Sequence, residues 1–198
     1  MGFRKEEKLY IKKENLLEFK SFLFSKNVKQ PYKSRTVQSL YFDNNKFEMF
    51  KDSIEGLQPR KKLRVRNYPD TNDQNFYFEV KYSSNEGRFK KKEIITKKNY
   101  DEKKLYGIFD SQYGLCFPQI FIQYKREYFI IDDVRISIDN DITYTKFLNN
   151  HITKDPRSIV EIKTNINKDQ DNLWSDFPFE RTRFSKYCSG IDFLSIIQ

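Results

Sequence analysis

The chain has 198 residues, with 37 Lys and Arg against 28 Asp and Glu, a formal net charge of +9 and a hydrophobic fraction of only 37%. The length suits one domain over residues 1–198, and the charge favours polyanionic partners such as phosphate chains, nucleotides, nucleic acid or an acidic membrane surface. Two cysteines argue against a disulfide framework or a zinc site, and no apolar run reaches the roughly 20 residues of a membrane span. We therefore expect a cytoplasmic chain that does not itself cross a membrane.

The first half of the chain alternates strand and helix patterns. Residues 3–11 (FRKEEKLYI) have weak strand alternation, and residues 13–26 place Leu and Phe at helical spacing. A strand is predicted at residues 36–42 and a short helix at 44–53, capped by Asp43 or Asn44. We expect Asp43 to cap that helix rather than to bind a metal.

Strands dominate the rest of the chain. Three are predicted at Lys61–Tyr68, Asn75–Tyr82 and Arg88–Thr96, separated by the turn-forming segments PDTND and SSNEG. A helix is predicted at residues 99–112. We then expect a hairpin of residues 119–132 and 134–142, a strand at 157–165, and a partly helical stretch from Trp174 onwards. The pattern predicts one α+β domain with about eight mostly antiparallel strands.

Several of these strands share an unusual charged face. In the segment RKKLRVRNY, Arg64 and Arg66 alternate with apolar Leu63 and Val65. Similar alternation places Glu79 with Lys81 and Glu161 with Lys163. A solvated sheet face would explain any one strand. All the strands together indicate a barrel whose charged faces point inwards and whose apolar faces are covered by helices outside. An eight-stranded barrel has room for one slender ligand, and clustered cations require an anion.

The ordered set of segments resembles a known family. FRKEEKLY, SLYFDN, KLRVRNY, FEVKY, YKREYF, RISIDNDI, SIVEIKT and RFSKY occur in this order over residues 3–190. The series resembles the VTC domain, the polyphosphate polymerase branch of the CYTH-like triphosphate tunnel metalloenzymes. That resemblance implies an eight-stranded antiparallel tunnel with a basic interior and outer helices. It also implies ATP or another triphosphate and inorganic polyphosphate as ligands, with Mn²⁺ or Mg²⁺ as the metal.

The resemblance assigns roles to individual residues. Lys8, Arg64, Arg66 and Glu161 are implied to be catalytic, and Glu161 and Glu6 to hold the metal. The implied phosphate-binding residues are Lys8, Arg64, Arg66, Lys81, Lys91, Arg126, Arg135, Lys163, Arg183 and Lys186. Lys90, Lys91 and Lys92 are alternatives for one position, and we favour Lys91. Glu6 and Glu79 are each left open as a second metal ligand or a counter-charge for the cations.

Two departures from the family pattern are visible. Arg4 stands where the wider superfamily begins its Glu-x-Glu-x-Lys motif, which favours the VTC branch and leaves fewer carboxylates for a second metal. Arg183 replaces a lysine, so a planar fork replaces a point donor. Eukaryotic complexes of the family also carry an SPX domain and membrane helices, which are absent from this sequence. A membrane-protein partner, with the chain peripheral to a membrane complex, therefore stays open.

Three functions are compatible with the resemblance. A polymerase transfers the γ-phosphate of ATP to a growing polyphosphate chain, and a triphosphatase transfers it to water on the same tunnel. A catalytically silent subunit binds polyphosphate without turnover. A nucleic-acid partner is not expected, because no helix-turn-helix, RRM, KH or zinc pattern is present and the cations have strand spacing.

Overall fold

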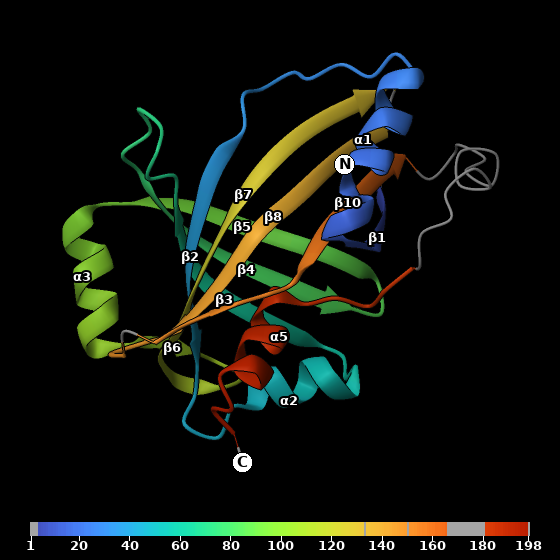
Figure 1. The fold of residues 1–198 in the computed structure, drawn as a ribbon. Helices are drawn as coiled ribbons and strands as arrows, with labels where there is room; N and C mark the ends of the chain where they lie inside the picture. Colours follow the sequence, from blue (N-terminus) through green and yellow to red (C-terminus); the bar gives the residue numbers. More distant parts are fainter. Residues whose placement is uncertain (1–3, 133, 150, 166–180, 198) are drawn as a thin grey trace. The chain divides into compact units, whose positions relative to one another are not determined.

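The computed structural model describes residues 4–132, 134–149, 151–165 and 181–197 (Figure 1). Within these ranges the helices are α1 (Leu16–Ser25), α2 (Glu48–Glu55), α3 (Lys97–Tyr106) and α5 (Lys186–Phe193), and the 3-10 turn η1 (Lys13–Asn15) precedes α1. The strands are β1 (Arg4–Lys12), β2 (Arg35–Asp43), β3 (Arg60–Asn67), β4 (Phe76–Ser84), β5 (Gly87–Ile95), β6 (Ile108–Asp110), β7 (Gly114–Ile131), β8 (Val134–Lys146), β9 (Ile152–Lys154) and β10 (Arg157–Asn165).

The chain forms two compact units, each of which collects distant segments. Unit 1 comprises Met1–Arg35, Tyr124–Ile142 and Asp155–Phe184. Unit 2 comprises Thr36–Gln123, Thr143–Lys154 and Ser185–Gln198. The long strands β7 and β8 contribute residues to both units.

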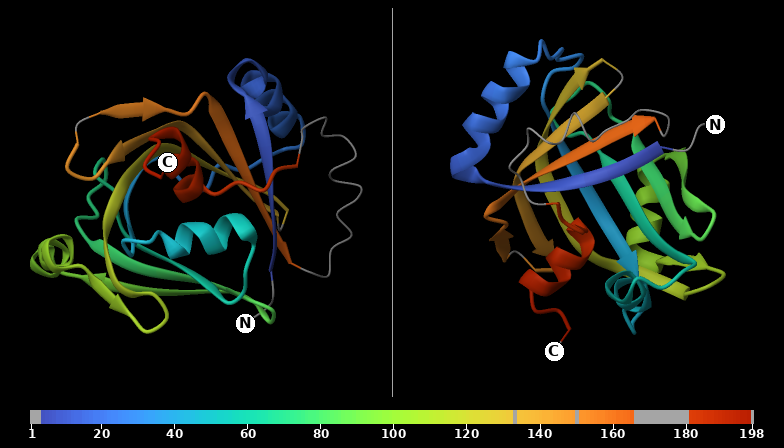
Figure 2. Two further views of the ribbon diagram at one scale, coloured as in Figure 1. Left: turned by 90° about the horizontal axis from the view of Figure 1, so that it is seen from below. Right: turned by 90° about the vertical axis from the view of Figure 1, so that its right-hand side faces the viewer.

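Unit 1 contains the strand order β1-β10-β8-β7. β10 pairs antiparallel with both β1 and β8, and β1 and β10 run side by side in Figure 2. On one face of these strands, apolar residues such as Leu9, Val160 and Ile136 pack against Phe19 and Leu23 of α1. The alternate residues of the same strands carry the charges, because successive strand side chains point to opposite faces.

Unit 2 contains the strand order β7-β2-β3-β4-β5, with β6 paired to β7 and β9 paired to β8. The apolar faces of β2, β3 and β4 form a core that includes Leu40, Leu63 and Val80. Helix α3 lies against this core through Tyr100, whose ring stacks on Phe76 at 4.5 Å between centroids. The predicted outer position of the helices is therefore seen for α1 in unit 1 and for α3 in unit 2.

Helix α5 packs instead on the charged face of unit 2. Its Tyr187 ring stacks on Tyr41 of β2 at 5.3 Å between centroids. A Cβ atom added at Gly190 would lie 2.6 Å from Ile120 Cδ1 and 2.8 Å from Tyr144 Cδ1. The small residue therefore allows α5 to approach β7 and β8 closely.

The predicted class, α+β with a mostly antiparallel sheet, is confirmed. The eight predicted strands correspond to the eight strands of the two orders above, and the short strands β6 and β9 were not predicted. The helix predicted at 99–112 was too long. It ends at Tyr106, because Gly107 adopts a left-handed φ of 80°, and residues 108–110 then form β6. A Cβ atom added at Gly107 would lie 2.7 Å from the Cys116 carbonyl oxygen, so the position also favours glycine for its lack of a side chain.

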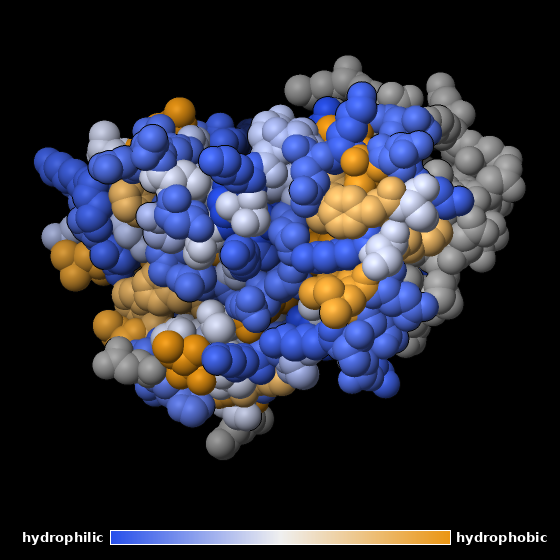
Figure 3. Space-filling model, turned by 45° about the horizontal axis from the view of Figure 1, so that its top comes forward, coloured by the Kyte–Doolittle hydropathy of each residue, from blue (hydrophilic) through white to orange (hydrophobic). Residues whose placement is uncertain are grey.

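Hydrophilic side chains cover most of the face shown in Figure 3, in keeping with the low hydrophobic fraction. None of the helices in the described ranges combines the length and apolar character needed to cross a membrane. The partly helical stretch predicted from Trp174 lies outside the described residues as far as residue 180, and its later part contains α5. The assignment of residues 1–198 to a single domain stays a prediction.

Candidate functional site: two cationic strand faces

Arg64 and Arg66 lie together on the charged face of β3 in unit 2. Register places Arg64 opposite Glu79 of β4 and Arg66 opposite Ser39 of β2. The Arg64 guanidinium donates to Glu79 Oε2 at 2.7 Å and to the Tyr41 hydroxyl at 2.7 Å. Only 5% of Arg64 and 7% of Arg66 is exposed, so the fold holds two cations side by side away from bulk solvent.

Glu79 is the carboxylate that neutralises part of this face. It is 1% exposed and also forms an ion pair with the Lys90 ammonium. Burial raises the pKa of Glu79, but the Arg64 and Arg66 guanidinium groups and Lys90 lower it further, so the net shift is well below its usual range. Both contacts and charge support the counter-charge role for Glu79 over the metal-ligand role.

The prediction that Lys91 of β5 shares the charged face was wrong. Lys91 pairs with Val80 in the antiparallel register, so it lies on the apolar side of β4, and its ammonium sits over the Tyr82 ring. Lys90 pairs with Lys81 and reaches Glu79. The two-residue turn between Ser84 and Gly87 sets this register, and the sequence alone did not fix it.

Tyr41 links the arginine pair to α5, and the sequence did not indicate its role. Its hydroxyl accepts from Arg64, and its ring stacks on Tyr187, whose hydroxyl donates to Asp43 at 2.7 Å. Burial raises the pKa of Tyr41, but the charges of Arg64, Arg66 and Lys186 lower it, and the net direction is downwards. The only sequence signal for this chain of contacts was the position of Tyr41 two residues from Asp43 on one strand face.

Asp43 caps α2, as the sequence predicted. Its carboxylate accepts from the backbone N–H groups of Met49 and Phe50 at 3.1 and 2.9 Å. Burial raises the pKa of Asp43, opposed by these hydrogen bonds and by the Tyr187 hydroxyl. Its oxygens are therefore occupied by protein donors.

The start of α5 brings a further lysine to this face. Ser185 caps the helix by accepting from Cys188 N, and its hydroxyl also accepts from the Lys62 ammonium at 2.8 Å. The predicted phosphate-binding residue Lys186 is half-buried as the first residue of α5, close enough for its charge to affect Tyr41. Lys81 is exposed on β4, opposite Lys62.

Unit 1 has its own charged face, centred on Glu161 of β10. Register places Glu161 opposite Lys8 of β1, and Lys163 opposite both Glu6 and Arg135. Glu161 is 8% exposed and forms an ion pair of 2.5 Å with Lys163. The Lys8 ammonium donates to the Phe184 carbonyl at 2.8 Å and lies 3.7 Å from Glu6. The structure thus brings Lys8, Glu6, Glu161 and Lys163 together.

Arg126 of β7 belongs to the same unit but has a strong protein partner. Its guanidinium donates twice to Asp139 of β8, at 2.5 and 2.7 Å. Burial lowers the pKa of Arg126, but the Asp139 carboxylate raises it, with a net shift well above its usual range. Asp139 was not among the predicted site residues, although it lies on the same face of β8 as Ser137, which pairs with Glu161. Arg135 and Arg183 are both exposed.

The carboxylates of unit 1 fit a divalent cation that also contacts phosphate. Glu161 and Glu6 lie diagonally on neighbouring paired strands and offer hard oxygen donors. Within the described ranges no group of three or more Asp, Glu, His or Cys gathers at one point. Mg²⁺ and Mn²⁺ are commonly held by one or two carboxylates, with phosphate oxygens and water completing the shell. This donor set therefore suits a metal that arrives with its substrate.

Comparison with solved structures defines the class of fold. A putative adenylate cyclase from Bacillus halodurans has a TM-score of 0.62 at 13% identity, over 93% of this chain and 96% of its own. A putative adenylyl cyclase from Hippeastrum, described as having a dominant triphosphatase activity, has a TM-score of 0.61 at 13% identity, over 97% and 96%. At such low identity the likeness shows the fold alone, which this chain shares with both proteins.

The family is shown by the sequence itself. The VTC domain family matches residues 3–195, nearly the whole chain. The chain therefore belongs to the VTC domain family, as the ordered motifs predicted. A comparison with curated proteins gave no match.

Proposed function

We propose that this protein binds triphosphate and inorganic polyphosphate on its cationic strand faces. We propose further that it transfers the γ-phosphate of ATP to a growing polyphosphate chain. Membership of the VTC domain family supports the substrate class. The charged faces of both units supply the groups such a reaction needs.

The observation that carries the proposal is the charge imbalance on the face of β3, β4 and β5. The cations that register places on this face are Arg60, Lys62, Arg64, Arg66, Lys81, Arg88, Lys90 and Lys92. Glu79 is the one carboxylate that these three strands place among them. Two like charges about 6 Å apart repel by roughly 3 kcal/mol at an effective dielectric of 20. A chain of phosphates offsets such repulsion.

Arg64 and Arg66 bind and orient the phosphates in this proposal. A guanidinium has a rigid fork of donors that matches two non-bridging phosphate oxygens. Glu79 and Tyr41 hold the plane of the Arg64 guanidinium in place before substrate arrives. Phosphoryl transfer depends mainly on such positioning and charge neutralisation.

In unit 1, Lys8 and Lys163 are the proposed phosphate-binding groups around Glu161. The Phe184 carbonyl holds the Lys8 ammonium in place and leaves it further protons to donate. Glu161 and Glu6 would hold Mg²⁺ or Mn²⁺. When bound, that ion supplies charge neutralisation for the phosphate oxygens.

The reaction balances without a general base. A terminal oxygen of the polyphosphate chain, already anionic, forms the new bond to the γ-phosphorus. The bond from the γ-phosphorus to the bridging oxygen of ADP breaks, and ADP leaves with the electron pair. The cations stabilise the negative charge that moves onto the leaving oxygen.

Hydrolysis is the second candidate, because water in place of the chain end gives a triphosphatase on the same groups. The activity described for the Hippeastrum protein, which shares the fold, favours keeping this candidate. A silent polyphosphate-binding subunit is the third, and the retained pair of Lys8 and Glu161 argues against it. We also propose a membrane-protein partner, which rests on family membership, and a location in the cytoplasm, which rests on the low cysteine content.

Incubation of the purified protein with ATP and Mn²⁺, followed by separation of the products, tests the proposal. We expect polyphosphate chains and ADP. Orthophosphate and ADP alone would establish the triphosphatase instead. Absence of turnover together with tight binding of tripolyphosphate would support a catalytically silent, polyphosphate-binding subunit.

Two substitutions connect any activity to the faces. Arg66→Ala should raise the Kd for tripolyphosphate at least tenfold, since a charge-assisted bidentate contact contributes about 1.5–3 kcal/mol. Glu161→Gln should abolish metal-dependent turnover while tripolyphosphate binding in the absence of metal persists. Lys98→Ala, an exposed lysine on α3, is the matched control and should behave as the unaltered protein. If Arg66→Ala and Lys98→Ala changed the Kd for tripolyphosphate equally, the charged face of β3 would not be the phosphate-binding site.

A further inference from the structure

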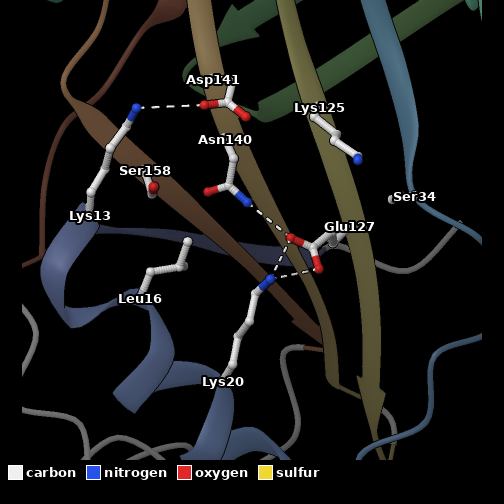
Figure 4. Close-up of a pocket in the computed structure, with 9 residues that line it drawn as sticks. All are labelled: Lys13, Leu16, Lys20, Ser34, Lys125, Glu127, Asn140, Asp141 and Ser158. Carbon is white, nitrogen blue, oxygen red and sulfur yellow. Dashed lines mark hydrogen bonds and ion pairs between the residues drawn. The ribbon is translucent and has the colours of Figure 1, made fainter.

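Unit 1 contains a cavity of about 490 Å³ beside the start of α1, away from the charged face just described (Figure 4). Its lining residue Ser158 is two positions from Val160, which packs in the α1 core, whereas Glu161 points to the other side of β10. We propose that this cavity is a second ligand site, and that it takes a small hydroxylated anion of the sugar-phosphate class.

Two buried polar atoms in the cavity wall have no protein partner within the described part of the chain. They are Asn140 Oδ1 and Ser158 Oγ, and Ser158 is 0% exposed. A buried polar atom without a hydrogen bond costs about 1–3 kcal/mol. Two such atoms in one cavity therefore indicate a surface that a polar ligand completes.

The neighbouring Glu127 fixes the orientation of the Asn140 side chain. Asn140 Nδ2 donates to Glu127 Oε1 at 3.0 Å. The reverse orientation would set the amide oxygen against a carboxylate. Asn140 Oδ1 is thus an acceptor, and a ligand must offer it an O–H or N–H donor.

The charges around the cavity favour an anion. Lys20 donates to both oxygens of Glu127 at 2.8 Å, and Lys13 lies 3.5 Å from Asp141. Lys125 adds a third ammonium at the exposed rim, so the lining lysines outnumber the carboxylates by one. Figure 4 shows the two paired lysines reaching across the cavity from the α1 side.

A sugar phosphate meets each of these requirements. Its hydroxyl groups donate to Asn140 Oδ1 and exchange hydrogen bonds with Ser158 Oγ, while its phosphate lies near Lys125. A bare metal ion would have to compete with lysines for both lining carboxylates, Glu127 and Asp141, and would face a net positive lining. A purely apolar ligand would leave both buried polar atoms unsatisfied.

Titration calorimetry of the full chain with glucose 6-phosphate, glucose and orthophosphate tests the proposal. Glucose 6-phosphate should bind at least tenfold more tightly than either part alone, since the site uses both the hydroxyls and the anion. Asn140→Leu and Ser158→Ala should each weaken its binding at least tenfold. Ser158→Ala should lower the melting temperature little, because its hydroxyl has no protein partner within the described residues. Asn140→Leu also removes the donor to Glu127 Oε1 and should lower the melting temperature more, so the Ser158 variant tests binding without that loss.

The matched control is Thr153→Val on β9, which removes a strand hydroxyl outside the cavity and should leave binding unchanged. Arg66→Ala should also leave glucose 6-phosphate binding unchanged, which separates this site from the proposed polyphosphate face. Equal affinity for orthophosphate and glucose 6-phosphate would overturn the proposal, as would a lack of binding. Unaltered affinity in both Asn140→Leu and Ser158→Ala would also overturn it.

Discussion

Glu79 has more cationic neighbours than any one carboxylate can neutralise. Arg64, Arg66 and Lys90 all lower its pKa, while its own burial opposes them. Removal of its charge leaves Arg64 buried without its carboxylate partner, which typically costs about 3–5 kcal/mol. Glu79→Gln should therefore lower the free energy of unfolding by about 3 kcal/mol at pH 7.

The pH dependence of this effect follows from the direction of the pKa shift. A carboxyl whose pKa is lowered on folding stabilises the protein at pH values above its unfolded pKa, and this stabilisation is lost as the pH falls towards the folded pKa. The difference in the free energy of unfolding between Glu79→Gln and the unaltered protein should thus become smaller below about pH 4.5. Urea unfolding across pH 3–7 measures it. Glu102→Gln on the exposed side of α3 is the control. If the loss of stability in Glu79→Gln were the same at every pH, the pKa of Glu79 would not be lowered on folding.

Tyr41 positions Arg64 through its hydroxyl. Tyr41→Phe removes one acceptor from a buried guanidinium and keeps the ring that stacks on Tyr187. We expect the Kd for tripolyphosphate to rise about tenfold, since hydrogen bonds to charged groups contribute about 1.5–3 kcal/mol. Calorimetric titration checks this, with Tyr106→Phe on the surface of α3 as control. An unchanged Kd would show that Glu79 alone orients Arg64.

At the residue scale, alternation predicted the face but not the contacts within it. The period of two placed Arg64, Arg66 and Glu79 on one side of the sheet correctly. It did not predict that Lys90 rather than Lys91 lies on this side, because the facing of β5 depends on how β4 and β5 pair across the turn between them. The bidentate partner Asp139 was also missed, since acidic residues at strand spacing are common on solvated faces.

At the element scale, helix α5 depends on the absence of a side chain at Gly190. A methyl group there would overlap Ile120 and Tyr144, which are both 0% exposed and so have little room to move. Gly190→Ala should gain about 0.5–1 kcal/mol of helix propensity and lose about 1–3 kcal/mol through overpacking. We expect a net loss of stability in thermal unfolding.

The control for this change is Ser189→Ala on the same helix, which is half-buried and should differ little from the unaltered protein. Tripolyphosphate binding should weaken in Gly190→Ala as well, because Tyr187 and Lys186 lie on α5. A melting temperature equal to or above that of Ser189→Ala would show that α5 accommodates the methyl group.

Strand patterns were easier to predict than helix ends. The strands β3, β4 and β5 were predicted within one or two residues, because turn-forming segments separate them and charged and apolar residues alternate along β3 and in the middle of β4. The segment 99–112 was predicted as one helix because Gly107 is compatible with a helix interior and with a helix end. Its left-handed backbone selects the end, and periodicity carries no information on that choice.

For the whole molecule, the net charge of +9 makes stability sensitive to polyanions. A ligand that binds only the folded state at 100 times its Kd stabilises it by about 2.7 kcal/mol. Tripolyphosphate should therefore raise the melting temperature by several degrees more than sodium chloride at equal ionic strength. Equal shifts would mean that general screening, rather than a built site, relieves the repulsion.

Contacts between residues far apart in the sequence could not be predicted from it. Tyr187 and Asp43 are 144 positions apart, and no local period connects them. The ordered motifs nevertheless identified the family over almost the whole chain, because many weakly specific segments in a fixed order are together specific.

The row of Lys62, Lys81 and Lys90 across β3, β4 and β5 has a consequence for how the chain is made. These lysines must come into register while the protein folds, and like charges directly opposite one another slow and weaken that pairing. Phosphate compounds in the surrounding solution would then reduce the repulsion between these lysines during folding, before they bind to the folded protein. We expect the yield of folded protein in a cell to follow its supply of polyanions.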